Sequence, residues 1–390
     1  MDLDSFTWLR SPAGEEVLAE AVRLSSEGVE ALRAGERLRR VTTSERAAVA
    51  MTQAELRRRA ADKFGDLAPR MYFTPDGLEQ STRIEVSRHR AARISFARPS
   101  SVVDLGCGIG GDLVALASTG VTTAGVDLDP VRAAVAEANL AALDLPGAVM
   151  AADATTLDLS GFGVAFADPA RRTGRGRVFD VDAYTPPWSF VESLLRRPAC
   201  VKVAPGIPHD RVPPGVEAEW VSFRGEVKEA ALWSPHLATT ARRATVMTGN
   251  GLATLTEEDD PGSAPVRPVG LYLYEPDGAV IRSGLVTAVA AVLDGGLLDR
   301  HIAYLTSDTE VTTPFARGYE VLEELPYHAK QLKAALRERG IGRLTIKKRG
   351  VDVVPEELRQ RLSLRGDAEA TLVMTRVDGH GTALLVRPLT

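Results

Sequence analysis

A glycine-rich turn directly after a short apolar strand is the feature that most constrains how this chain of 390 residues can fold. Residues 102–105 read Val-Val-Asp-Leu, and glycine fills four of the six positions from Gly106 to Gly111. Asp112 then opens a helical pattern. Glycine tolerates positive φ angles and lets a ligand approach the backbone closely. A strand, a glycine turn and a helix in this order predict the first unit of a Rossmann-like α/β fold.

The following 150 residues repeat the alternation of strand and helix. Strands are expected at 102–105, 121–126, 148–151, 164–167 and 201–204, with helices at 112–118 and 130–143. Short apolar strands separated by helices predict a parallel sheet that is covered on both faces. Residues 216–233 and 244–247 are strand-like, and we expect them to complete the sheet as antiparallel hairpin strands.

The segments on either side of this core have different sequence patterns. Residues 1–98 have helical patterns at 15–32 and 46–63, and residues 256–268 are rich in Glu, Asp, Pro and Gly, as in a linker. A helix is expected at 280–293. The last 70 residues suggest a small α+β unit, with helices at 328–339 and 355–362 and strands at 343–348, 370–377 and 383–387. We therefore expect four parts: a helical domain at 1–98, the α/β core at 99–249, a linker and connecting α/β segment at 250–320, and the α+β domain at 321–390.

Composition excludes several classes of protein. No stretch approaches the roughly 18 consecutive apolar residues of a membrane span, and the first ten residues have no secretion signal. Two cysteines, Cys107 and Cys200, cannot form a disulfide scaffold, which favours the cytoplasm. The six histidines lack metal-ligand spacing, so no metal is expected. We expect a monomer, although no sequence feature fixes the oligomeric state.

The formal net charge of −5 conceals a segregation of charge along the chain. Residues 33–98 sum to +7 and residues 327–390 to +6, whereas residues 99–326 sum to −13. Two basic flanks around an acidic centre can bind a polyanion. Solvated helix faces would explain the same charges.

Four aspartates at successive strand ends point to a cofactor. Gly106, Gly108 and Gly111 also fit the dinucleotide pattern G-x-G-x-x-G, but a carboxylate at Asp104 would repel a pyrophosphate and attract the α-ammonium of S-adenosylmethionine (SAM). Asp127 can accept hydrogen bonds from both ribose hydroxyls of either cofactor. Residues 73–82 precede the turn and can cover the cofactor, with Gln80 or Thr82 at the methionine carboxylate, unless they only cap a helix. Asp153 and Ala154 are expected at the adenine. The full set of expected SAM contacts is Asp104, Gly106, Cys107, Gly108, Gly110, Asp127, Leu128, Asp153, Ala154, Gln80 and Thr82.

These motifs resemble those of a known superfamily. Residues 102–112, with Gly-Val-Asp-Leu-Asp-Pro at 125–130, resemble motifs I and II of class I SAM-dependent methyltransferases. The whole chain resembles a bacterial family with a methyltransferase core and a THUMP-like C-terminal domain. The stretches 73–82, 168–172, 201–206, 274–282 and the last 70 residues carry this resemblance. The core is also similar to trimethylguanosine synthases and other RNA guanine or adenine N-methyltransferases, especially at the glycine pair 110–111.

The resemblance implies a chemical site at the end of the fourth strand. In amino-methyltransferases an Asp/Asn-Pro-Pro-aromatic motif holds the target amine, and the aromatic ring stacks on the base. Here Asp168 and Pro169 keep the first half, but Ala170, Arg171 and Arg172 replace the rest. We expect Asp168, Pro169, Arg171 and Arg172 to be catalytic, with Asp168 orienting the amine and stabilising its developing positive charge.

Three further sets of residues each leave two alternatives open. Arg171, Arg172, Arg175 and Arg177 either bind phosphate or form a solvated loop. Phe179, Tyr184 and Trp188 either supply a stacking platform or pack the lid. Lys202 and Glu226 lie in strand-like runs and either border the pocket or form an ion pair at a sheet end.

The THUMP-like resemblance implies RNA binding, and both flanks supply cations. They are Lys330, Lys333, Arg337, Arg339, Arg343 and residues 346–350 (Ile-Lys-Lys-Arg-Gly) at the C-terminus, and Arg37, Arg39, Arg40 and Arg57–Arg59 at the N-terminus. We expect a SAM-dependent methyltransferase that N-methylates a base of structured RNA, tRNA or rRNA. The alternatives are a small-molecule or protein methyltransferase and a non-catalytic RNA-binding protein with a SAM fold.

Overall fold

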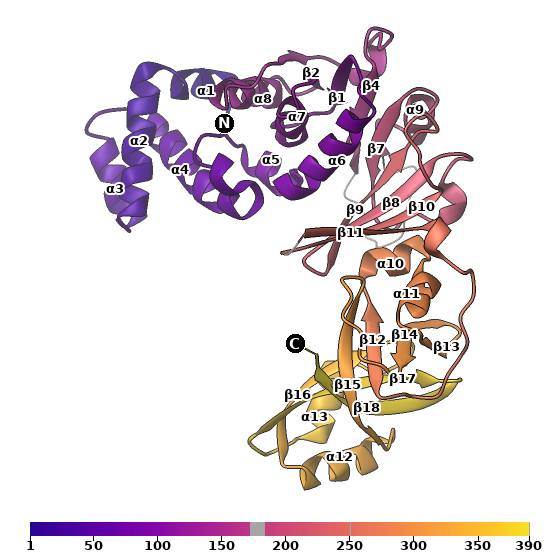
Figure 1. Cartoon of the computed structure of the whole chain (residues 1–390). Coiled ribbons are helices and arrows are strands. Elements are labelled where there is room, and N and C mark those ends of the chain that lie inside the picture. Colours follow the sequence, from indigo (N-terminus) through magenta and orange to yellow (C-terminus); the bar gives the residue numbers. More distant parts are fainter. Residues whose placement is uncertain (172–183, 250, 390) are drawn as a thin grey trace. The chain divides into compact units, whose positions relative to one another are not determined.

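The computed structural model describes residues 1–171, 184–249 and 251–389 (Figure 1). It divides into two compact units. The first comprises residues 1–216 with 231–238, and the second comprises residues 217–230 with 239–390. No helix in the described ranges is long and apolar enough to cross a membrane.

Six helices open the first unit. They are α1 (Leu3–Leu9), α2 (Pro12–Ser26), α3 (Ala31–Leu38), α4 (Ser44–Phe64), α5 (Pro75–Gln80) and α6 (Ile84–Phe96). The single helix expected at 15–32 is wrong, because the chain leaves the helix after Ser26 and Gly28 adopts a φ of 71°. Glycine takes this left-handed conformation without the steric cost that a Cβ imposes, so it ends the helix.

A parallel sheet follows, as expected. Its strands in this unit are β1 (Ser101–Leu105), β2 (Thr122–Asp127), β3 (Ala148–Ala151), β4 (Val164–Ala167) and β7 (Ala199–Val203), in the spatial order β7-β4-β1-β2-β3. The connections include α7 (Gly111–Ala117), α8 (Pro130–Ala142) and α9 (Trp188–Leu194). The strand order reverses at β1, and the crevice at such a reversal is where open α/β sheets bind ligands.

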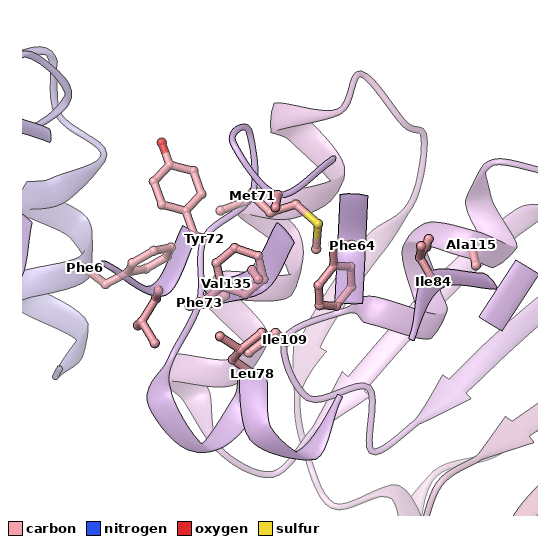
Figure 2. Packing of buried hydrophobic residues seen from close by; sticks show 14 of the residues in the cluster. Phe6, Phe64, Met71, Tyr72, Phe73, Leu78, Ile84, Ile109, Ala115 and Val135 are labelled. Atoms are coloured by element: carbon pink, nitrogen blue, oxygen red, sulfur yellow. The ribbon is translucent and has the colours of Figure 1, made fainter. Parts of the chain in front are cut away.

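Buried aromatic and aliphatic side chains attach the N-terminal helices to this sheet domain (Figure 2). Phe64 and Phe73 have ring centroids 5.5 Å apart, and Ile109 of the glycine turn belongs to the same buried cluster. Asn139 of α8, which is fully buried, donates to the carbonyls of Tyr72 and Ile109 and accepts from the Tyr72 amide. One side chain thus ties the segment before α5 to the glycine turn.

The second unit begins with further strands, β8 (Glu217–Phe223), β10 (Arg242–Thr248) and β11 (Gly251–Thr256), and with the first part of β9 (Glu226–Trp233). The antiparallel arrangement expected for residues 244–247 is wrong with respect to β8, since β10 pairs with β8 in parallel and with β11 in antiparallel fashion. The antiparallel pair of β10 and β11 ends at Thr256, where the linker was expected to begin.

The rest of the second unit is a seven-stranded sheet with helices. In spatial order its strands are β13 (Gly296–Asp299), β14 (Ile302–Ser307), β12 (Tyr272–Pro276), β15 (Ala316–Leu325), β18 (His380–Pro388), β17 (Ala368–Val377) and β16 (Ile341–Lys348). The helices are α10 (Gly278–Ser283), α11 (Val286–Val292), α12 (Ala329–Glu338) and α13 (Pro355–Leu362). The single helix expected at 280–293 is wrong, because Gly284 takes a φ of 73° and separates α10 from α11. The α+β pattern expected for the last 70 residues is confirmed.

Candidate functional site

The glycine turn after β1 curls back onto the end of β2. The amides of Gly106 and Cys107 both donate to the Val126 carbonyl, at 2.8 and 2.9 Å. Gly106, Gly108 and Gly110 all have positive φ angles, between 57° and 83°. A Cβ on Gly110 would lie 3.1 Å from Ala136 of α8, whereas one on Gly108 would meet no atom within 4 Å. The turn is therefore packed on its helix side and open around Gly108.

Asp104 lies beneath this turn as an isolated buried carboxylate. It is 1% exposed, and neither carboxylate oxygen has a hydrogen-bond partner in the described part of the chain. Burial, reinforced by the carboxylates of Asp112 and Asp168, raises the pKa of Asp104 well above its usual range. A buried carboxylate of this kind gains most from a ligand that brings a positive charge with N–H donors.

Asp127, at the end of β2, organises the turn from the other side. Its carboxylate accepts from the Gly108 amide at 2.8 Å and from the Asp129 amide at 2.9 Å. Each carboxylate oxygen has a second lone pair, so Asp127 can accept further hydrogen bonds from a ligand. Leu128 beside it is 74% exposed, which leaves an apolar surface at this strand end.

Asp153, after β3, caps the short 3-10 helix Ala154–Thr156. Its carboxylate accepts from the Thr155 hydroxyl at 2.7 Å and from the Thr155 amide at 2.9 Å, and these bonds lower the pKa of Asp153. Asp129 caps α8 through the Val131 amide. Asp153 is exposed at the carboxyl edge of the sheet, with one oxygen engaged by the cap.

At the end of β4, Asp168 forms an ion pair with a lysine that the sequence left ambiguous. Lys202 of β7 lies beside it in register, with Nζ 2.6 Å from Asp168 Oδ2 and 3.1 Å from the Thr82 hydroxyl. The Lys202 side chain is 17% exposed and that of Asp168 31%. Lys202 thus joins the fourth strand to the cover segment. Glu226, the other ambiguous residue, pairs with Lys228.

A second ion pair, between Asp112 and Arg90, was missed by the sequence reasoning. Asp112 opens α7, and Arg90 of α6 donates to its carboxylate and also lies over the Phe166 ring, 4.7 Å from the ring centroid. Burial opposes ionisation of Asp112, but Arg90, Lys202 and nearby hydroxyls outweigh it and lower its pKa. The available signal was the position of Arg90 between Val86 and Ile94 on the buried face of α6, where a cation needs a partner.

Residues 73–82, which are expected to cover the cofactor, lie beside the glycine turn. Thr74 caps α5 through the Gly77 amide, and a Cβ on Gly77 would lie 2.3 Å from the Ile109 side chain. Lys63 of α4 donates to the carbonyls of Leu78, Glu79 and Ser81, which holds the end of α5. Within this segment Gln80 is exposed and Thr82 is buried.

The loop after Pro169 lies largely outside the described residues. This applies to Arg172, Arg175, Arg177 and Phe179, whereas the backbones of Ala170–Arg171 and Tyr184–Thr185 pair as the short strands β5 and β6. Tyr184 is 4% exposed, its hydroxyl accepts from the Ala204 amide, and its ring contacts Trp188 edge-on. Tyr184 therefore packs the site wall, and stacking on a base is not its role in this conformation.

The basic residues of the flanks are only partly available to a ligand. Lys347 lies 2.6 Å from Glu275, Arg349 lies 3.6 Å from the same carboxylate, and Arg339 pairs with Glu323. Arg57 donates to the Met71 carbonyl and lies over Tyr72. Two of the three cations at 347–349 therefore share the Glu275 carboxylate, so the basic C-terminal residues are less available to a ligand than their number in the sequence indicates. Lys330 and Lys348 are exposed.

Comparison with known proteins places this geometry in context. A family model described as "THUMP domain-like" matches residues 316–388, and one described as a domain of unknown function matches residues 2–60. Two curated proteins of Mycobacterium tuberculosis, from strains CDC 1551 / Oshkosh and ATCC 25618 / H37Rv, are each 39% identical over 352 residues, which cover 85% of this chain and 95% of theirs. Both are described as uncharacterized S-adenosylmethionine-dependent methyltransferases.

A solved structure extends the similarity to nearly the whole chain. The crystal structure of a candidate methyltransferase from Porphyromonas gingivalis W83 covers 96% of this chain and 99% of its own, with a TM-score of 0.78 and 24% identity. At this identity the similarity establishes the fold. The expected α/β fold with a THUMP-like C-terminal region is confirmed.

Proposed function

We propose that this chain, which belongs to the family of S-adenosylmethionine-dependent methyltransferases, methylates RNA. The proposed acceptor is an amino nitrogen of a base in structured RNA, either tRNA or rRNA. Family membership confirms the methyltransferase activity class and SAM as the cofactor. The nature of the acceptor is our proposal. The observation that carries it is the proximity of the unpartnered Asp104 carboxylate to Asp168 at the carboxyl ends of neighbouring strands.

The donor sets at three strand ends fit SAM. Asp104 would hold the α-ammonium, because its buried carboxylate needs a cation. Asp127 would accept from the ribose hydroxyls while it keeps the Gly108 amide in place. Leu128, Asp153 and Ala154 would line the adenine, with the free lone pairs of Asp153 facing the exocyclic amine. When bound, SAM supplies a methyl group on a sulfonium, which an acceptor nitrogen can attack in line.

Asp168 would then hold the acceptor. Lys202 occupies its Oδ2, so Oδ1 is the oxygen presented to an N–H of the acceptor amine. Accepting that hydrogen bond orients the nitrogen lone pair and offsets the positive charge that develops on nitrogen during transfer. We retain Pro169, Arg171 and Arg172 as proposed site residues because they follow Asp168 directly in the chain.

The THUMP-like match and the basic flanks support RNA as the partner. Lys330 and Lys348 are exposed cations within the matched residues 316–388. We also propose the four-part organisation with boundaries near residues 98, 249 and 320, a monomeric state and a cytoplasmic location, where the buried free thiols of Cys107 and Cys200 would stay reduced. No group of His, Cys, Asp and Glu suited to a metal occurs among the described residues.

The test is methyl transfer from SAM carrying tritium in its methyl group to material from cells that lack the protein. We expect label in the RNA fraction that ribonuclease releases and protease does not, and no label with Asp168→Asn. Label in protein or in small molecules would replace the RNA proposal with the corresponding alternative. Tight SAM binding with no transfer to any fraction would favour a non-catalytic RNA-binding protein.

A further inference from the structure

We propose that Lys202, together with Thr82, binds the α-carboxylate of the cofactor's methionine moiety. This inference rests on the proposed function, because it assumes that Asp104 receives the α-ammonium. It gives Lys202 a binding role in addition to its ion pair with Asp168.

The charges at the site create the need for such a cation. The ammonium and carboxylate of an amino acid are attached to the same carbon, so a ligand whose ammonium meets Asp104 places its carboxylate a few ångströms away. Burial raises the pKa of Asp104 most, and the nearby carboxylates of Asp112, Asp168 and Asp127 raise it further. A ligand carboxylate in this negative surrounding would be repelled unless a cation faces it.

In the described part of the chain, Arg90, Lys63, Arg83 and Lys202 are cations near this position, and the first three are held by other groups. Arg83 donates to the carbonyl and the carboxylate of Asp62. Arg90 is 3% exposed and is held between Asp112 and the Phe166 ring. An ammonium has three N–H donors, and Lys63 uses all three on the carbonyls of residues 78, 79 and 81. Lys202, whose side chain is 17% exposed, is the one of these four whose ammonium contacts both Asp168 and Thr82.

The contacts of Lys202 also place it at the right boundary. Its ammonium lies between Asp168 of the chemical site and the hydroxyl of Thr82 in the cover segment. A carboxylate that approaches Lys202 from the cover side can also accept a hydrogen bond from Thr82 once the Thr82 hydroxyl turns away from Asp112. Lys202 would then contact both the cofactor carboxylate and Asp168. A bound cofactor would in this way hold Asp168 in position for the acceptor.

Two probes that differ only at the amino-acid end test this assignment by calorimetry. S-adenosylhomocysteine has the ammonium and the carboxylate, whereas 5′-methylthioadenosine has neither. We expect Lys202→Met to weaken S-adenosylhomocysteine binding about 10- to 100-fold, the usual worth of a charge-assisted contact, and to change methylthioadenosine binding less than about twofold. Lys202→Arg should recover part of the affinity, and Thr82→Val should show a smaller loss for the same probe.

Controls separate this role from its alternatives. Lys228→Met makes the same replacement at a lysine that pairs with Glu226, outside the proposed site, and should bind both probes like wild type. Unchanged S-adenosylhomocysteine affinity in Lys202→Met, or equal losses for both probes, would overturn the proposal. If Asp168→Asn reproduces the selective loss, Lys202 acts only through Asp168, which also overturns it. Failure of the wild-type protein to bind either probe would refute the cofactor site itself, a result distinct from failure at Lys202.

Discussion

The substitution Asp104→Asn should weaken ligand binding and raise the stability of the ligand-free protein. Asp104 is 1% exposed and has no hydrogen-bond partner in the described structure, so its charge serves a ligand and not the fold. Removing one partner of a buried charged contact costs about 2–4 kcal/mol. We therefore expect Asp104→Asn to weaken the binding of S-adenosylhomocysteine about 30- to 1,000-fold, measured by calorimetry.

The stability of the ligand-free protein should rise instead. Because burial raises the pKa of Asp104, its ionisation opposes folding as the pH rises above the unfolded value. Below about pH 4 the carboxyl is protonated in both states, so the variant gains nothing there. At neutral pH the variant should unfold at a higher temperature than wild type, and this advantage should shrink as the pH is lowered.

Asp112→Asn is the matched control, since the pKa of Asp112 is lowered by its partners. This variant should be less stable than wild type at neutral pH, and the difference should disappear as the pH falls through the lowered pKa. Thermal unfolding followed by circular dichroism over this pH range compares all three proteins. Asp104→Asn with unchanged ligand affinity, or with reduced ligand-free stability at neutral pH, would refute the role given to Asp104.

Three further variants probe the rest of the account. Asp127→Ala should weaken SAM binding, measured by calorimetry, at least about 30-fold, because the ribose contacts and the Gly108 hydrogen bond are both lost. The control Asp144→Ala, at an exposed site, should bind SAM like wild type. Asn139→Ala should lower the free energy of unfolding in urea by about 2–4 kcal/mol, since it leaves buried backbone groups of Tyr72 and Ile109 unpaired. A loss under about 1 kcal/mol, the worth of one ordinary hydrogen bond, would contradict this. Replacing both Lys330 and Lys348 with Ala should weaken RNA retention and reduce its salt dependence by about two counterions, while Lys228→Ala should not.

The strand ends of the site were predictable because strand, turn and charge occur together in the sequence. Asp104, Asp127 and Asp168 each follow or end an apolar run, and parallel strands bring their carboxyl ends to one edge. The cover segment was also predictable in position, since it directly precedes the first strand. These inferences needed only local periodicity and the rule for ligand sites in α/β sheets.

The ion pairs were harder to predict because they join residues far apart in the sequence. Lys202 and Thr82 are 120 positions apart, and only the register of β7 beside β4 brings the lysine to Asp168. The same limit applies at the C-terminus, where the run at 346–350 looked like a ligand surface. Glu275, more than 70 residues earlier, pairs with two of its cations, and a count of local charges cannot detect that contact.

Helix boundaries failed for a different reason. Gly28 and Gly284 lie inside apolar patterns that continue on both sides, so periodicity alone predicted single helices. Both glycines adopt left-handed conformations that end the helix, and this choice depends on the packing of the flanking segments.

The central claim is that this SAM-dependent methyltransferase modifies RNA through Asp168. Mass spectrometry of nucleosides from digested RNA tests it most directly, in cells that lack the protein and in the same cells supplied with wild type or with Asp168→Asn. The account predicts that one methylated nucleoside is missing, that wild type restores it, and that Asp168→Asn does not. An unchanged set of methylated nucleosides in tRNA and rRNA, or full restoration by the variant, would contradict it.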